Sequence, residues 1–174
     1  MFLQNSKFTE RYGDSMAEII SVEHINPFLA SAKQILGQVC GIQIELGRIS
    51  KDNIIIEGEP VFIILGITGK ITGQVCMVFD IAGAKDIASR MMMGMPVTEM
   101  DDMAKSALSE LGNMIMGNAA TILSGSNLGV DITPPTLAIG TAKIASPNIT
   151  SFKVPLLYEG GEIKFFFMLK LADQ

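Results

Sequence analysis

Four residues of this sequence have the types and the spacing to act together on a partner: Ser106, Glu110, Asn113 and Gly117. Their spacings of four, three and four keep them on one narrow stripe of a helix, because successive helical residues turn by about 100°. The apolar residues of the same segment, with Leu111 near their centre, fall on the other side. A carboxylate and an amide are therefore expected to face solvent or a partner, not the core.

Small residues surround this acid and amide, among them Ser109, Gly112 and Gly117. Each glycine inside a helix costs about 1 kcal/mol relative to alanine, so a reason for it is worth seeking. One reason is clearance, if the helix pushes Glu110 and Asn113 into the cleft of another protein. The alternative is that the glycines let a neighbouring helix pack closely while the acid and the amide are ordinary surface residues. Spacing alone favours the alternative, because this pair occurs often by chance.

Helices and hairpin strands must position this stripe, which predicts an α+β fold. Helices are predicted from the N-cap Asn26 to Cys40, over residues 83–93, and from residues 98–102 to Ser124, the last about 39 Å long. Strands are predicted at 54–57, 61–67 and 74–79, with a final hairpin over 149–158 and 163–171. The expected architecture is a layered α/β sandwich with a mostly antiparallel sheet and long helices packed on it.

The first and third predicted helices contain similar strings, which suggests a duplicated helix-plus-strands unit. Residues 31–38 read SAKQILGQ and residues 106–113 read SALSELGN. In this register the first copy has Ile35 where the second has Glu110, and Gln38 where the second has Asn113. Only the second copy would then keep the full acid and amide pair.

Composition and charge exclude several classes of function. The 174 residues are 48% hydrophobic and 18% charged, with a net charge of -5, which indicates a compact chain without a basic patch for nucleic acid. No apolar run approaches the roughly 20 residues of a spanning helix, so we expect no membrane insertion and a cytoplasmic location. One domain is expected over residues 19–174, preceded by an N-terminal extension over residues 1–18.

The cysteines and the single histidine give no metal or triad chemistry. Cys40 and Cys76 are far apart in apolar contexts and are expected to be small buried hydrophobic residues. His24 alone builds neither a metal cluster nor a His-based triad, and is expected to be partly exposed before the first helix.

Eight of the twelve methionines fall between Met91 and Met116. They could form an adaptable partner-binding surface or fill the core at the junction of two helices. We favour core filling by roughly two to one.

Three motifs together resemble the CheC/CheX/FliY phosphatases of chemotaxis: SALSELGNMIMG from Ser106, VDITPPT from Val130 and ILGITGKITGQVCMVF from Ile64. The resemblance covers roughly residues 20 to 171. CheC-like members carry two active motifs and CheX-like members one, so this chain, with Ile35 in place of the first acid, looks CheX-like. The resemblance also implies a pseudo-repeated unit and a homodimer.

The resemblance implies hydrolysis of the aspartyl phosphate of a CheY-type response regulator. The residue matching Asn113 would orient the attacking water, and the residue matching Glu110 would pair with a lysine of the receiver. Ser106, Gly117 and Pro134 or Pro135 would support this geometry. No cofactor of the chain's own is implied, since Mg²⁺ is expected in the partner receiver. A non-catalytic module that binds a response regulator or resembles the flagellar switch is the alternative of the same fold.

Overall fold

The computed structural model describes residues 20, 22–145 and 149–172, so the predicted extension over residues 1–18 lies outside the described part. The helices there are α2 (Val22–Cys40), α3 (Ile81–Met91) and α4 (Asp102–Gly125). The strands are β1 (Glu45–Leu46), β2 (Ser50–Lys51), β3 (Ile54–Ile56), β4 (Val61–Gly69), β5 (Ile71–Phe79), β6 (Val130–Ile132), β7 (Thr136–Ile139), β8 (Ala142–Ile144), β9 (Ser151–Tyr158) and β10 (Gly161–Leu171).

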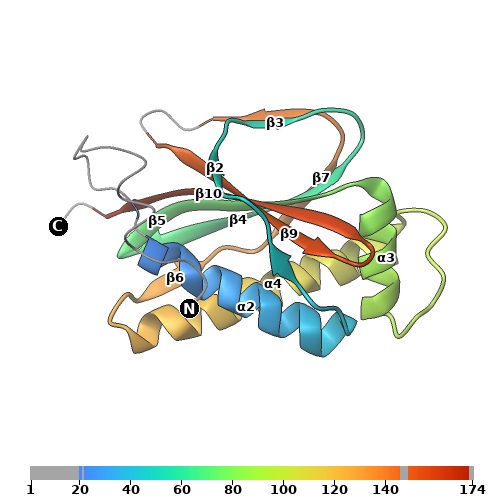
Figure 1. Ribbon diagram of the computed structural model, residues 1–174, viewed down its shortest axis with the longest axis horizontal. Helices are drawn as coiled ribbons and strands as arrows, with labels where there is room; N and C mark the ends of the chain where they lie inside the picture. The colour runs from blue at the N-terminus through green and yellow to red at the C-terminus, as the bar shows by residue number, and fades with distance from the viewer. Residues whose placement is uncertain (1–19, 21, 146–148, 173–174) are drawn as a thin grey trace.

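The elements form the predicted layered α+β sandwich. An antiparallel eight-stranded sheet has the order β1-β9-β10-β5-β4-β6, with β2 paired to β9 and β7 paired to β4. Helices α2 and α4 lie side by side on one face of this sheet, and the β3–β8 pair lies over the opposite face (Figure 1). Helix α3 stands at one end, beside the N-terminal end of α4 (Figure 1).

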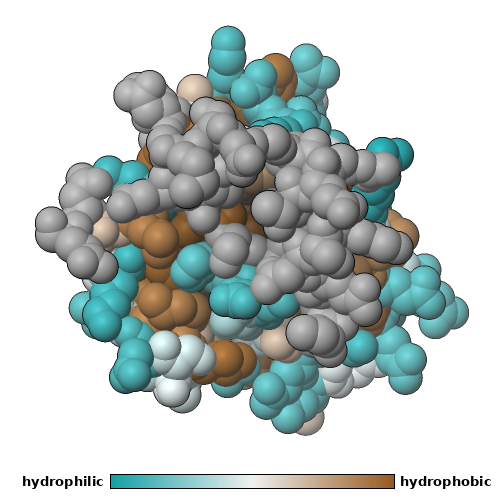
Figure 2. Space-filling view, turned by 60° about the vertical axis from the view of Figure 1, so that its left-hand side comes forward, coloured by the Kyte–Doolittle hydropathy of each residue, from teal (hydrophilic) through white to brown (hydrophobic). Residues whose placement is uncertain are grey.

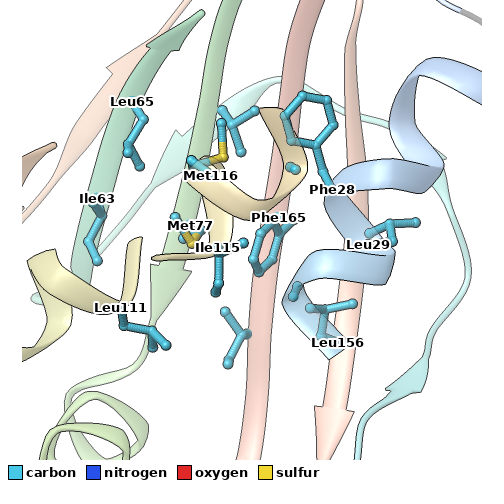
Figure 3. Close-up of a cluster of buried hydrophobic side chains, with 14 of the residues drawn as sticks. Phe28, Leu29, Ile63, Leu65, Met77, Leu111, Ile115, Met116, Leu156 and Phe165 are labelled. Carbon is cyan, nitrogen blue, oxygen red and sulfur yellow. The ribbon is translucent and has the colours of Figure 1, made fainter. Parts of the chain in front are cut away.

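The central strands are buried on both faces, because each face has its own cover. On β5, Val75 and Met77 point to the helices, whereas Cys76 and Val78 join the smaller core under β3 and β8. The larger core brings side chains of α2, α4 and the sheet together (Figure 3). This arrangement explains why the sequence of β10 is apolar at nearly every position from Ile163 onward.

Both cysteines are free and buried, as the sequence predicted. Burial raises the pKa of Cys40 to about 11 and the pKa of Cys76 to about 12. The thiols therefore stay protonated at neutral pH and pack as apolar groups.

The start of the first helix was predicted wrongly. Helix α2 begins at Val22, so Asn26 is not its N-cap and Pro27 lies inside it. His24 is accordingly a partly exposed residue of the first helical turns, and burial lowers its pKa. Helix α4, in contrast, begins within the predicted range, because the carboxylate of Asp101 accepts the backbone N–H of Ala104.

The strand order shows the duplication directly. Exchanging β1 with β6, β9 with β4 and β10 with β5 gives the same order reversed, and β3 pairs with β8. One half is α2 with β1 to β5, the other is α4 with β6 to β10, and α3 is inserted between them. The fold is therefore a pseudo-two-fold pair of helix-plus-strands units.

The described helices include none that is long and apolar enough to cross a membrane. On the face shown in Figure 2, hydrophobic residues reach the surface between hydrophilic ones. Exposed apolar residues scattered in this way are ordinary for a folded protein.

The methionines divide between the two expected roles. Met116 is fully buried and Met100 packs against the core, whereas Met93, Met95 and Met103 are 97%, 52% and 59% exposed. Core filling is therefore correct for some of them only, and the exposed ones need a separate account.

Met93 occupies a position that favours glycine. It follows α3 with φ +59°, and the N–H of the next residue, Gly94, donates to Ser89 O in the manner of a Schellman motif. The left-handed conformation costs methionine roughly 1–2 kcal/mol, and glycine would avoid this cost. Part of that gain would be cancelled, because glycine has more conformational freedom in the unfolded chain. We expect Met93→Gly to raise the free energy of unfolding by about 0.5–1 kcal/mol. Urea unfolding measures this, and an unchanged midpoint would argue against strain at this position.

Candidate functional site

The predicted stripe is on the outside of α4. Ser106 and Glu110 are exposed, and Asn113 and Gly117 are half-buried. Residues on the other side of the helix are buried in the main core; they include Leu108, Leu111 and Ile115. Asp101 starts the helix, so its direction and the facing of the stripe are set from the first turn. An acid and an amide one turn apart are thus available to a partner.

Gly112 does not give clearance around the acid and the amide. Its backbone is buried, and a Cβ there would lie 3.4 Å from Ile63 Cγ2 and 3.4 Å from Met77 Cε. At about 100° per residue, Gly112 stands some 200° from Glu110, on the sheet side of the helix. Gly112 lets α4 approach β4 and β5 closely, around the Leu111 region seen in Figure 3.

Gly117 has the surroundings that clearance requires. A Cβ at Gly117 would have no heavy atom within 4 Å among those considered around it, and its carbonyl accepts the hydroxyl of Thr121 at 3.0 Å. The two helical glycines therefore differ in purpose: one faces the sheet and the other leaves open space beside the amide.

Helix α2 holds α4 in place through a buried contact. The Ser31 hydroxyl donates to the carbonyl oxygen of Ile115 at 2.6 Å, and Ser31 is fully buried. Nearer the surface, Asn118 Nδ2 lies 3.4 Å from Gln34 Oε1. A hydroxyl that bonds to the neighbouring helix fixes the rotation of α4, and with it the facing of the stripe.

The predicted register between the two halves is wrong. It equates buried Ser31 with exposed Ser106, and buried Ile35 with exposed Glu110. A shift of 87 residues, which carries position 23 to position 110, instead superposes five buried positions of the two helices, although buried Ile35 then matches the exposed Ile122. The matched buried residues are Ile25, Phe28, Leu29, Ala32 and Leu36 in α2 with Gly112, Ile115, Met116, Ala119 and Leu123 in α4.

With the corrected register, the equivalents of the α4 acid and amide are also an acid and an amide. They are Glu23, which is exposed, and Asn26, which is half-buried. The Oδ1 atom of Asn26 is buried and has no hydrogen-bond partner among the described residues. An amide whose oxygen is turned inward does not present both its donor and its acceptor to a partner. Sequence analysis missed this pair because it compared short strings, not buried positions.

Pro134 and Pro135 lie in the link between β6 and β7, away from the helical stripe in sequence. Pro134 is exposed and Pro135 is half-buried. The link is fastened to β4 because Thr133 N donates to Gly66 O at 3.0 Å and Thr133 Oγ1 accepts the N–H of Gly66 at 2.8 Å. The prolines therefore follow a segment that is hydrogen-bonded to β4, and their side chains carry no group that could react.

The N-terminal end of α4 is acidic. Glu99, Asp101 and Asp102 are exposed there, and Lys105 lies 3.7 Å from Asp102 at the surface. The described residues contain no group of three or more His, Cys, Asp or Glu side chains that could hold a metal ion. The stripe therefore offers hydrogen bonding and one carboxylate charge.

Comparisons with known proteins agree with this fold. A family model described as chemotaxis phosphatase CheX matches residues 61–156. The CheY-P phosphatase CheX of Thermotoga maritima is 35% identical over 116 residues, covering 67% of this chain and 75% of that protein. A CheX from Desulfovibrio desulfuricans superposes with a TM-score of 0.76 at 23% identity, covering 87% of this chain and all of that one (100%).

A further solved structure is the CheX-CheY-BeF3-Mg complex from Borrelia burgdorferi. A chain of that complex superposes with a TM-score of 0.71 at 29% identity, covering 84% of this chain and 97% of that chain. The match of the family model includes α4 and its exposed stripe. The chain belongs to the CheX family of chemotaxis phosphatases.

Proposed function

We propose that this protein removes the phosphoryl group from a phosphorylated CheY-type response regulator, using Glu110 and Asn113 of α4. The observation that carries the proposal is the outward placement of both side chains on a helix whose other face is fixed to the sheet. The family supports the reaction, and the complex of a relative with CheY supports the partner.

Asn113 would orient the attacking water. Its carboxamide can accept one hydrogen bond from water and donate another without a charge that repels the phosphoryl group. Holding the water in line with the bond to be broken removes much of the entropic cost of the attack. A rigid helix suits this role, because the Ser31 bond to Ile115 O fixes α4 on the side away from the partner.

Glu110 would pair with the receiver lysine one helical turn away from the water. A carboxylate makes a charge-assisted hydrogen bond to an ammonium, which positions the two proteins as well as attracting them. The acidic end of α4, with Glu99 and Asp102, adds attraction for a basic partner surface.

The reaction balances without a covalent intermediate on this chain. The oxygen of water bonds to phosphorus while the bond from phosphorus to the aspartyl oxygen breaks. The regulator recovers its carboxylate, and inorganic phosphate leaves with the protons of the water. No cofactor of this chain's own is needed, since the Mg²⁺ that neutralises the phosphoryl oxygens is expected in the receiver.

Ser106, Gly117, Pro134 and Pro135 would support the geometry without reacting. The open space at Gly117 leaves room for a receiver loop beside the amide. The prolines close a link that Thr133 ties to β4.

An assay that follows phosphoryl loss from the regulator over time tests the proposal. Wild-type protein is expected to accelerate the decay. Binding to the regulator with an unchanged decay rate would instead indicate a non-catalytic module of the same fold, and the proposed function would be withdrawn.

Glu110→Gln tests the charge pair. We expect kcat/KM to fall by about 5- to 15-fold, because a charge-assisted hydrogen bond of about 1.5–3 kcal/mol becomes a neutral one of about 0.5–1.5 kcal/mol. Glu59→Gln is the matched control, since it removes the same charge from an exposed position between β3 and β4, outside α4. Equal losses in both variants would mean that overall charge, not pairing at Glu110, sets the rate.

A further inference from the structure

Met103 stands on the outer side of α4, at about 20° around the axis from Glu110 and about 80° from Asn113. It is the second residue of the helix and precedes Glu110 by seven residues, which is about two turns and about 10 Å along the axis. Its side chain is 59% exposed. The outer ridge of α4 therefore begins with a large apolar residue and continues with small or polar ones; in order they are Ser106, Glu110, Asn113, Gly117 and Thr121.

Local structure does not require an apolar residue at this position. The N-cap is supplied by Asp101, and the ion pair of the first turn joins Lys105 to Asp102. Met100, three residues earlier, already packs against the main core. A single exposed methionine is unremarkable in itself, so its register with Glu110 is what carries the argument.

We propose that Met103 is part of the receiver-binding surface and packs against the regulator while Asn113 enters its phosphorylation site. The inference rests on the proposed function. A specific interface buries about 800 Å² on each partner, which is roughly a disc of 16 Å radius and more than two side chains supply. Met103 lies ten residues, about 15 Å along the axis, from Asn113, so a partner centred on Asn113 reaches it. Met103 is the large apolar residue within that reach toward the N-terminus of α4.

The charge near Met103 indicates which class of partner can bind there. Glu99, Asp101 and Asp102 lie within four residues of it in sequence and are exposed, and their carboxylates repel anionic lipid and nucleic acid. A protein surface with an apolar centre and basic edges fits this end of the ridge. Methionine suits such a contact, because its unbranched, polarisable side chain adapts to the shape of a partner.

Met103→Gln tests the inference, since it keeps the length and helix propensity but removes the apolar surface. We expect KM for the phosphorylated regulator to rise about tenfold with kcat unchanged. Ile122→Gln is the matched control: Ile122 is 37% exposed on the same helix but lies a third of a turn or more away from every residue of the stripe. Its KM is expected to equal that of the wild type.

Several outcomes would overturn the inference. They are an unchanged KM in Met103→Gln, an equal rise in Ile122→Gln, or a loss of kcat alone. Sedimentation of Met103→Gln tests whether Met103 instead contacts a second copy of the chain. If the wild-type dimer dissociates in the variant while KM stays unchanged, Met103 belongs to that dimer contact. Affinity for a beryllofluoride-activated regulator separates the two proposals. Weaker binding of Met103→Gln supports the surface even if no hydrolysis occurs, in which case only the proposed function fails.

Discussion

Asn113→Ala is expected to abolish acceleration of dephosphorylation, with at least a 100-fold drop in the rate above the regulator's own decay. The loss follows from removing the group that orients the water, because alanine can neither accept nor donate the required hydrogen bonds. Folding should be nearly unchanged, since Asn113 is half-buried on the outer face of α4 and alanine is the best helix former. Phosphoryl loss over time measures the rate, and urea unfolding checks the fold.

Asn26→Ala is the matched control that the duplicated fold provides. Asn26 is the equivalent of Asn113 in the other half, but its side-chain oxygen is buried without a partner among the described residues. We therefore expect Asn26→Ala to keep the wild-type rate and to cost little stability. Full activity in Asn113→Ala would remove the assigned role. A comparable loss in Asn26→Ala would mean that the α2 pair takes part.

Gly73→Ala is expected to have the largest effect on stability. Gly73 is in β5 with φ +138°, a conformation that favours glycine. An added Cβ would collide with the carbonyl oxygen of Met168 and lie 3.0 Å from the Cα of Leu169 on the paired strand β10. Both contacts are to backbone, which cannot move aside without opening the central strand pair. We expect a loss of about 3 kcal/mol or more.

Unfolding in urea measures that loss, with Gly129→Ala as the comparison. A Cβ at Gly129 meets nothing within 4 Å, and its φ lies outside the range that favours glycine. This variant should stay within about 1 kcal/mol of the wild type. If Gly73→Ala is equally mild, then β5 and β10 do not approach each other as closely as described.

The features that the sequence predicted correctly depend on local signals. The end of α4 near Gly125, the outward stripe and the β9–β10 hairpin follow from caps, turn residues and the period of apolar positions. The buried state of Cys40 and Cys76 follows from their apolar neighbours. Such signals need only a few adjacent residues, so they can be recognised without knowledge of the fold.

The predictions were wrong where contacts between residues far apart in the sequence determine the structure. Asn26 and Pro27 have the types of a cap and a first helical residue, yet α2 begins earlier, and Ile25 is fully buried against the core. Burial of that side chain favours helix before the proline, even though Pro27, the sixth residue of α2, lacks the N–H that a helix interior uses. The short β1 and β2 carry too few residues for a pattern and form by pairing with β9.

Short repeated strings likewise do not identify which residues of the two halves are equivalent. The similarity of residues 31–38 to residues 106–113 is local, whereas equivalence is defined by which side chains meet the sheet. Strand order and burial establish this equivalence, and both depend on contacts between residues that are far apart in the sequence. The role proposed for Met103 also needed the structure, because residue type and spacing alone do not separate exposed methionines from buried ones.

The pseudo-two-fold order of the strands allows the halves of one chain to specialise. Helix α4 displays an acid and an amide, while α2, in the equivalent place, has a proline in its first turns and uses Ser31 to hold its neighbour. Since the sheet accepts a long helix at either place, the exposed residues of one helix can differ from those of the other with no change of topology.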